Sequence, residues 1–178
     1  LKKQFSRIKE DFCFLFTGHW LSGNLGEDRK DIGMMLKVFY TMFKNQKNQP
    51  ALILKTSGAG FSILDRNEMM KRIKMVKDSM NIEKLPPVYL LHGDLTDEEM
   101  NQMYNHPKVK AHLSFTHGEG FGRPLLEASF SGKPILAPIA TGQADFLSKD
   151  YTVELPHSMT KVPGNAFPKD YGNPEAEW

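Results

Sequence analysis

Two glutamates, Glu119 and Glu127, stand eight positions apart around the turn Gly120-Phe121-Gly122. An apolar stretch, residues 111–115, precedes this segment and another, residues 134–138, follows it, so the order is strand, glycine loop, proline-started helix, strand. The free N–H groups at such a helix N-terminus attract an anion such as a phosphate. The two carboxylates can accept hydrogen bonds from neutral hydroxyls on either side of it. The pattern is therefore suited to a sugar nucleotide.

Each of these residues also has a plainer interpretation. The glycines can form an ordinary strand-to-helix turn, and Glu127 can be a solvent-facing helical glutamate. The apolar neighbours of Glu127, which include Leu125, Leu126 and Phe130, favour a crevice instead. In a crevice its carboxylate can accept both hydroxyls of a ribose, as the acidic residue of dinucleotide folds does.

Two other kinds of site fit less well. A dinucleotide-binding loop needs a third glycine in G-x-G-x-x-G, and Gly120-Phe-Gly-Arg-Pro lacks it. Glu119 and Glu127 could be the acid and nucleophile of a glycosidase. Because both come from one turn-and-helix segment and no second carboxylate cluster accompanies them, we disfavour that interpretation as well.

The composition of the 178-residue chain is that of one soluble globular domain, with 40% hydrophobic and 25% charged residues. A net charge of +2 gives no case for a nucleic-acid partner. The single cysteine, Cys13, lies in an apolar run, which predicts a buried inert thiol and a cytoplasmic location. No apolar run approaches the ~20 residues of a transmembrane helix. Since the chain begins at Leu1, we expect it to be a piece of a longer protein.

Strand and helix patterns alternate along the chain, which predicts an α/β fold with a doubly wound, Rossmann-like, mostly parallel sheet of about six strands. Asp31 is expected to cap one helix, and Thr96 to begin another with a capping box that runs to about Asn105. Residues 1–155 would form this domain and residues 156–178 a loop-rich tail. The expected strands are 12–16, 51–54, 88–91, 111–115 and 135–137; the expected loops are 20–28 and 57–65; helices carry Ile32 to Phe43, Met69 to Met80 and Pro124 to Ser131.

The glutamate segment and the Ser131-Gly-Lys-Pro-Ile-Leu-Ala137 that follows it resemble the E-x7-E signature of retaining GT-B glycosyltransferases, chiefly the large family four. The likeness runs from about Phe12 to about Leu155. It implies the C-terminal, donor-binding half of a two-domain enzyme of hexosyltransferase type, whose N-terminal Rossmann-like domain would be missing from this chain. The donor would be a nucleotide sugar, UDP- or GDP-linked, with neither a cofactor nor a metal, and the acceptor stays open.

The resemblance also implies roles for individual residues. Glu127 would bind the ribose, Glu119 the donor sugar, and Lys30 the diphosphate, so that Glu119 and Lys30 carry catalysis. The amides of residues 120–122 would assist at the diphosphate. The family places an arginine after the glycine of the first strand, but here His19 follows Gly18, so Arg29 or His19 would replace that arginine. Two alternatives stay open: a non-catalytic nucleotide- or sugar-binding module, and a GT-B-like sugar-nucleotide epimerase.

Overall fold

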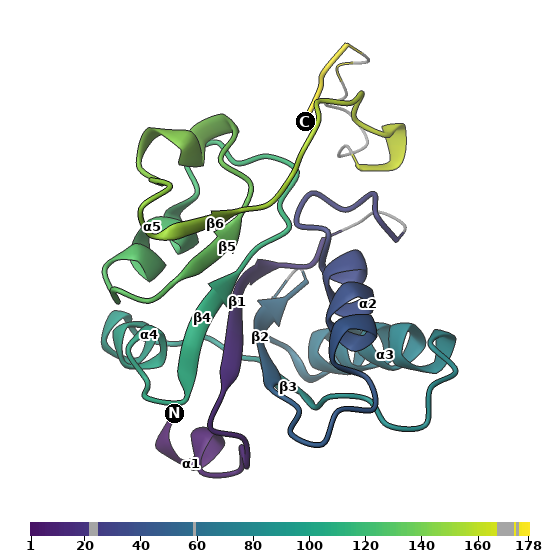
Figure 1. Ribbon diagram of the computed structural model, residues 1–178. Helices are drawn as coiled ribbons and strands as arrows, with labels where there is room; N and C mark the ends of the chain where they lie inside the picture. Colours follow the sequence, from purple (N-terminus) through teal and green to yellow (C-terminus); the bar gives the residue numbers. More distant parts are fainter. Residues whose placement is uncertain (22–24, 59, 167–172, 174) are drawn as a thin grey trace.

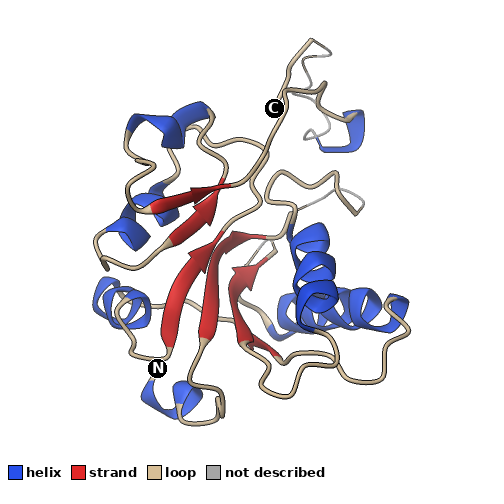
Figure 2. Cartoon of the chain, in the orientation of Figure 1, coloured by secondary structure: helices blue, strands red, loops and turns tan. Residues whose placement is uncertain are grey.

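A computed structural model describes residues 1–21, 25–58, 60–166, 173 and 175–178. Its centre is one six-stranded sheet in which every neighbouring pair of strands is parallel (Figures 1 and 2). The strand order is β3-β2-β1-β4-β5-β6, which is the order of the Rossmann fold. The predicted fold class is confirmed. The strands are β1 (Cys13–His19), β2 (Ala51–Ser57), β3 (Val88–Leu91), β4 (Val109–Leu113), β5 (Ile135–Ala137) and β6 (Thr152–Glu154).

Helices cover both faces of the sheet (Figure 1). On one face α2 (Ile32–Phe43) and α3 (Ile63–Ser79) enclose a hydrophobic cluster with Phe16, Leu52 and Leu54. On the other face α1 (Lys2–Phe5), α4 (Asp97–Tyr104) and α5 (Arg123–Ser129) enclose a second cluster with Leu15, Ile53 and Ile135. Short 3₁₀ turns are η1 (Thr141–Asp145) and η2 (Gly164–Ala166). Because the central strands are buried on both faces, they are almost wholly apolar.

The strand order reverses between β1 and β4. From β1 the chain proceeds through α2 to β2, whereas from β4 it proceeds through α5 to β5, on the opposite side. The two connections leave the carboxyl edge of the sheet in opposite directions and open a crevice there. In open α/β sheets ligands bind at such a switch point. The glycine loop, residues 118–122, follows β4 and therefore lies at this edge.

The helix ends differ from expectation at two caps. Asp31 is at the N-cap position of α2, but its backbone is left-handed (φ 47°) and its side chain makes no capping bond. The capping carboxylate is Asp28, whose Oδ2 accepts from Ile32 N–H at 3.3 Å. At α5 the N-cap is Gly122, with φ 86°, so Pro124 follows the first helical residue rather than being it. The capping box of Thr96 and Glu99 on α4 is confirmed.

Several predicted boundaries shift. The strands predicted at 88–91 and 135–137 are confirmed, but the strand predicted at 111–115 is β4, which ends at Leu113. After β4, Ser114 N–H still donates to Leu136 O at 2.9 Å, and Thr116 N–H donates to the Ser114 hydroxyl at 3.4 Å, a contact within the loop. Helix α3 begins at Ile63, inside the predicted loop 57–65, since Ser62 caps it by accepting from Asp65 N–H. Strand β6 and helix α1 had no predicted counterpart.

The tail folds back over the sheet edge. Among the described residues after 155, an antiparallel bridge joins Lys161 to Glu177, and Trp178 stacks on His117 with ring centroids 4.7 Å apart. Parts of the predicted loops and tail, residues 22–24, 59, 167–172 and 174, lie outside the described residues. The division of the chain at residue 155 stays a prediction.

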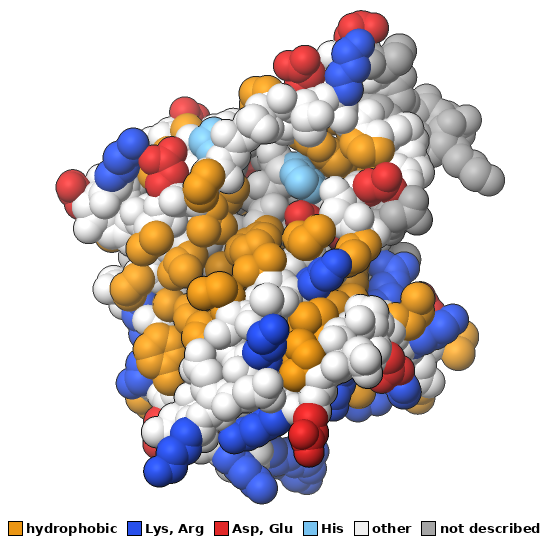
Figure 3. Space-filling model, turned by 45° about the vertical axis from the view of Figure 1, so that its right-hand side comes forward, with side chains coloured by type: hydrophobic (Ala, Val, Ile, Leu, Met, Phe, Trp, Pro, Cys, Tyr) orange, Lys and Arg blue, Asp and Glu red, His pale blue; other side chains and the backbone are white. Residues whose placement is uncertain are grey.

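The surface combines charged and hydrophobic regions. Figure 3 shows hydrophobic side chains over the middle of one face and lysine and arginine side chains along its lower edge. In the described part of the chain, no helix has the length and apolar character needed to cross a membrane. Cys13 is fully buried, as predicted, and burial raises the pKa of its thiol to about 11.

Candidate functional site

A cleft of about 800 Å³ runs along the carboxyl edge of the sheet. It begins at the glycine loop after β4, passes the ends of β1 and β2, and reaches the segment after β3. Helices α4 and α5 line its other side. Of the residues predicted for the site, all but Gly120 line this cleft: Gly18, His19, Arg29, Lys30, Glu119, Phe121, Gly122 and Glu127. Gly120 lines a second cavity of about 850 Å³, which shares Arg29 and Glu119 with the first.

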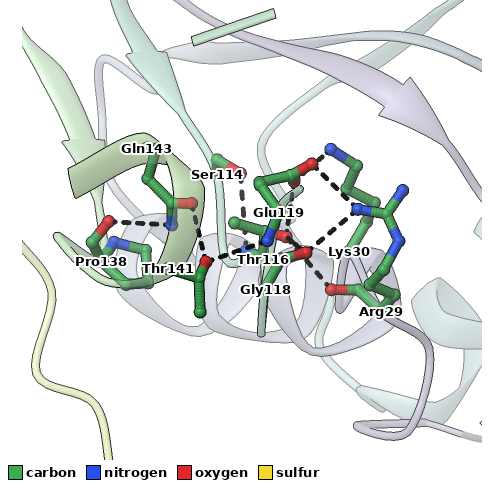
Figure 4. A network of polar contacts seen from close by, with 9 residues as sticks. All are labelled: Arg29, Lys30, Ser114, Thr116, Gly118, Glu119, Pro138, Thr141 and Gln143. Atoms are coloured by element: carbon green, nitrogen blue, oxygen red, sulfur yellow. Dashed lines mark hydrogen bonds and ion pairs between the residues drawn. The ribbon is translucent and has the colours of Figure 1, made fainter. Parts of the chain in front are cut away.

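Glu119 is the centre of the polar network at one end of the cleft (Figure 4). Its Oε1 accepts from the Lys30 ammonium and, at 2.6 Å, from the Thr116 hydroxyl. Its Oε2 accepts from Arg29 Nη1 at 2.9 Å, and the same nitrogen donates to Gly118 O at 3.0 Å. Lys30 and Arg29 precede α2, whereas Glu119 follows β4, so the network joins the two sides of the switch point.

The ionisation state of each residue in this network depends on the charges of its neighbours. Burial acts to raise the pKa of Glu119, but Lys30, Thr116 and Arg29 outweigh it and hold that pKa below its usual range. Burial lowers the pKa of Lys30, and Glu119 opposes that effect. The side chains of Lys30 and Glu119 are only 8% and 7% exposed, whereas Arg29 is 41% exposed. We therefore assign an ionised Glu119 paired with a charged Lys30.

A second set of contacts fixes the backbone of the glycine loop. Glu119 N–H donates to the Thr141 hydroxyl at 3.0 Å, and Gly142 N–H donates to Glu119 O at 3.0 Å. Turn η1 packs so closely that a Cβ at Gly142 would collide with the Gly120 carbonyl. The loop after β4 is thus held from both sides, by the charges of Arg29 and Lys30 just before α2 and by the backbone of η1.

Glu127 lies in the same cleft but in a separate contact set. Its Oε1 accepts from Arg123 Nε at 2.6 Å, one helical turn earlier, and its Oε2 accepts from the Tyr104 hydroxyl at 3.0 Å. The side chain of Glu127 is 29% exposed. It is neither a freely solvated helical glutamate nor fully buried, and Tyr104 of α4 orients it from the cleft wall. The structure does not bring Glu127 into contact with Glu119.

His19 contacts β2 rather than Glu119. Its Nδ1 lies 3.0 Å from the Ser57 hydroxyl, and the residue is exposed. Arg29, by contrast, reaches the Glu119 carboxylate. Of the two residues proposed to replace the arginine, only Arg29 places a permanent cation in the network.

Sequence reasoning did not single out Thr116 and Tyr104, which bind the two glutamates. Thr116 could have been found from the sequence, because its hydroxyl stands three residues before Glu119 and can reach that carboxylate locally. Tyr104 comes from a different helix, and only the packing of α4 against α5 brings it to Glu127. Among the described residues, no three His, Cys, Asp or Glu side chains are grouped as metal ligands would be.

Comparisons with known proteins support the fold. The chain matches no protein-family model and no curated protein. It is similar to the solved C-terminal domain of a glycosyl transferase group 1 family protein (LpcC) from Francisella tularensis. The TM-score is 0.59 and the identity 17%, over 85% of this chain and 71% of that one.

Two longer structures are similar over much of this chain. Anabaena Alr3699/HepE, solved with UDP and glucose, gives a TM-score of 0.57 at 14% identity over 93% of this chain and 38% of that one. A UDP-forming α,α-trehalose-phosphate synthase from Burkholderia xenovorans, solved with glucose-6-phosphate, gives a TM-score of 0.57 at 8% identity, over 80% of this chain and 32% of that one. The chain thus spans about a third of these two proteins. At such identities the likeness establishes the fold alone, a Rossmann-like α/β fold that matches the C-terminal domain of a glycosyl transferase.

Proposed function

We propose that this chain is the donor-binding domain of a retaining glycosyltransferase that takes its sugar from a nucleotide sugar. The observation that carries the proposal is the ionised Glu119, neutralised by Lys30 and Arg29 across the switch point and open to a cleft that leads to Glu127. The fold supports it, since the similar structures include a glycosyl transferase domain and a protein solved with UDP and glucose.

The contacts suggest how the donor is divided along the cleft. Glu119 offers about four lone-pair positions, and the described residues occupy three of them. The remaining position on Oε2 accepts a hydroxyl of the donor sugar. Lys30 and Arg29 border the same point and carry the positive charge that a diphosphate needs. Glu127, further along the cleft, accepts the ribose hydroxyls.

Catalysis would be electrostatic. As the bond from the sugar to the diphosphate breaks, negative charge develops on the departing phosphate oxygens. Lys30 has three N–H donors, of which one is used by Glu119, so it can stabilise that charge while it remains paired. At the start of α5, Pro124 has no N–H and Leu125 N–H donates to Gly122 O, so Arg123 N–H is the group of this turn left to add a positive partial charge. The acceptor would be bound by a second, N-terminal Rossmann-like domain of the same protein.

A binding experiment tests the proposal. We expect UDP or GDP, and the corresponding sugar nucleotides, to raise the melting temperature of the chain, because a ligand that binds only the folded state stabilises it. Arg29→Ala should reduce that shift without unfolding the protein, since Arg29 is partly exposed. Lys9→Ala removes an equal charge outside the cleft and serves as the control. The proposal is wrong if none of these compounds shifts the melting temperature. It is also wrong if Arg29→Ala shows the same shift as the wild type and the Lys9→Ala control.

A further inference from the structure

The far end of the cleft carries a cation and an anion whose charges interact. Lys55 is on β2 and Asp94 follows β3, and both line the cleft beyond the ends of β1 and β4. If the sugar and diphosphate occupy the end at Glu119 and Lys30, and the ribose lies at Glu127, then the nucleotide base extends to this far end. This placement of the base therefore rests on the proposed function.

Lys55 is fixed as a hydrogen-bond donor. Its Nζ donates to Gly93 O at 2.6 Å and lies 5.3 Å from the centre of the Phe61 ring. Burial lowers the pKa of Lys55, and the Asp94 carboxylate opposes that change. An ammonium has three N–H donors, and the described residues use one, so two remain for a ligand.

Asp94 is fixed as an acceptor. Its Oδ1 accepts from the N–H of Leu95 at 3.1 Å, which orients the carboxylate at the start of the segment after β3. Its Oδ2 has no hydrogen-bond partner among the described residues, and the residue is exposed to the cleft. The wall next to it is apolar, with Leu95 and Met100, and Phe61 offers an exposed aromatic ring near Lys55. A planar base can stack on such a ring.

We propose that this end of the cleft recognises guanine, with Lys55 donating to O6 and Asp94 accepting from N1–H and the N2 amino group. The pairing edge of guanine presents one acceptor beside two donors, which complements one donor beside a two-oxygen acceptor. Uracil presents a single donor between two carbonyl oxygens, and one of these would face the carboxylate. Adenine has no carbonyl for Lys55 and directs the unprotonated N1 at an acceptor. The donor class is therefore a GDP-sugar rather than a UDP- or ADP-sugar.

The first measurement compares bases at constant phosphate and ribose. Calorimetric titrations of the wild type with GDP, IDP, UDP and ADP should give the tightest binding for GDP. Because IDP lacks only the N2 amino group, which would bond to a carboxylate, its affinity should be roughly 10- to 100-fold lower. Binding of UDP or ADP as tight as that of GDP would overturn the assignment of guanine while leaving the proposed function intact. If no nucleoside diphosphate binds, the proposed function fails and the base assignment with it.

The second measurement changes the side chain that would contact the N2 amino group of guanine. Asp94→Asn replaces one acceptor oxygen by an NH₂ donor, which suits the O2 carbonyl of xanthine rather than the amino group of guanine. We expect this variant to lose affinity for GDP and to gain affinity for XDP, so that their order reverses. Asp150→Asn makes the same chemical change in an exposed turn before β6, outside the cleft, and should keep the wild-type order. An unchanged preference for GDP over XDP in Asp94→Asn would show that Asp94 does not contact the base.

Discussion

Lys30 and Glu119 are 89 positions apart in the sequence, yet their charged groups form an ion pair that is almost entirely buried, with side chains 8% and 7% exposed. Lys30 stands before α2 and Glu119 after β4, so the pair bridges the point where the strand order reverses. A buried pair is costly to form and costlier to break, because a single partner left behind is an uncompensated charge. The pair consequently ties the geometry of the cleft to the stability of the domain.

The two partners should respond unequally to removal. Glu119→Gln leaves the Lys30 ammonium buried without a carboxylate, and we expect it to lose about 3–5 kcal/mol of unfolding free energy. Lys30→Met should cost less, since Arg29 and Thr116 still bind Glu119. The double variant should be more stable than the sum of the two losses predicts. Urea unfolding of all four proteins measures this, and strictly additive losses would mean that the two residues are not coupled.

Glu127 gives a direct test of ribose recognition. Hydrogen bonds to a charged group contribute about 1.5–3 kcal/mol, so Glu127→Ala should weaken nucleoside diphosphate binding roughly 10- to 100-fold. Glu127→Gln should recover part of the loss, because its amide keeps one acceptor oxygen. The wild type should discriminate against 2′-deoxy nucleotides and the alanine variant should not. Calorimetric titration measures all of these affinities.

The matched control for Glu127 is Glu98→Ala. Glu98 is also a helical glutamate with a side-chain partner, since it accepts from Gln102, but it does not line the cleft. Its removal should leave binding unchanged. Equal affinities for the wild type and Glu127→Ala, with an unchanged circular dichroism spectrum, would reduce Glu127 to a structural contact of Arg123 and Tyr104.

A buried carboxylate beside the site should make stability depend on pH. Burial raises the pKa of Asp31 to about 6, with the nearby Asp28 adding to the rise and His117 opposing it. The folded protein therefore binds more protons than the unfolded chain between about pH 4 and pH 6, so its stability falls as the pH rises through this range. Above pH 6 the full cost of the ionised group is present.

Asp31→Asn removes that cost without disturbing the backbone, because asparagine tolerates the left-handed conformation at this position well. At pH 7 we expect the variant to be more stable than the wild type by about 1–3 kcal/mol, and at pH 4 to be nearly equal to it. Unfolding by urea at a series of pH values measures the difference. A constant difference across the series, or the same result from Asp150→Asn, would contradict the assignment of Asp31.

The sequence predicted those features that depend on neighbouring residues. Strands β3 and β5 were placed to the residue, because prolines precede short apolar runs in both cases. The parallel sheet followed from the alternation of strand and helix patterns, and the capping box at Thr96 from its local spacing. Strand β6 was not located, since Thr152-Val-Glu154 is three residues long with an exposed valine.

Features that depend on the order of the strands could not be read from the sequence. The meeting of Lys30 with Glu119 requires β1 and β4 to be neighbours, and local patterns do not determine which strands pair. The same holds for Tyr104 at Glu127, which requires α4 to pack beside α5. At α2 two acidic residues, Asp28 and Asp31, competed for one cap, and only the left-handed backbone at Asp31 decides in favour of Asp28.

Alanine substitutions at two glycines, one in the glycine loop and one in η1, distinguish a ligand-binding role from a structural role. A Cβ at Gly120 would meet no atom within 4 Å, so Gly120→Ala should leave the unfolding free energy nearly unchanged. If the donor approaches this backbone closely, the same variant should bind nucleotide sugars more weakly.

A Cβ at Gly142 would collide with the Gly120 carbonyl and lie 2.8 Å from Glu119 O, so Gly142→Ala must displace the loop. We expect it to lose about 1–3 kcal/mol of stability, the usual cost of overpacking, as well as affinity. Gly164→Ala, which also meets no atom within 4 Å and lies in the tail, is the control for both. Thermal unfolding and calorimetry together measure the two effects, and full stability in Gly142→Ala would mean that η1 does not hold the loop in place.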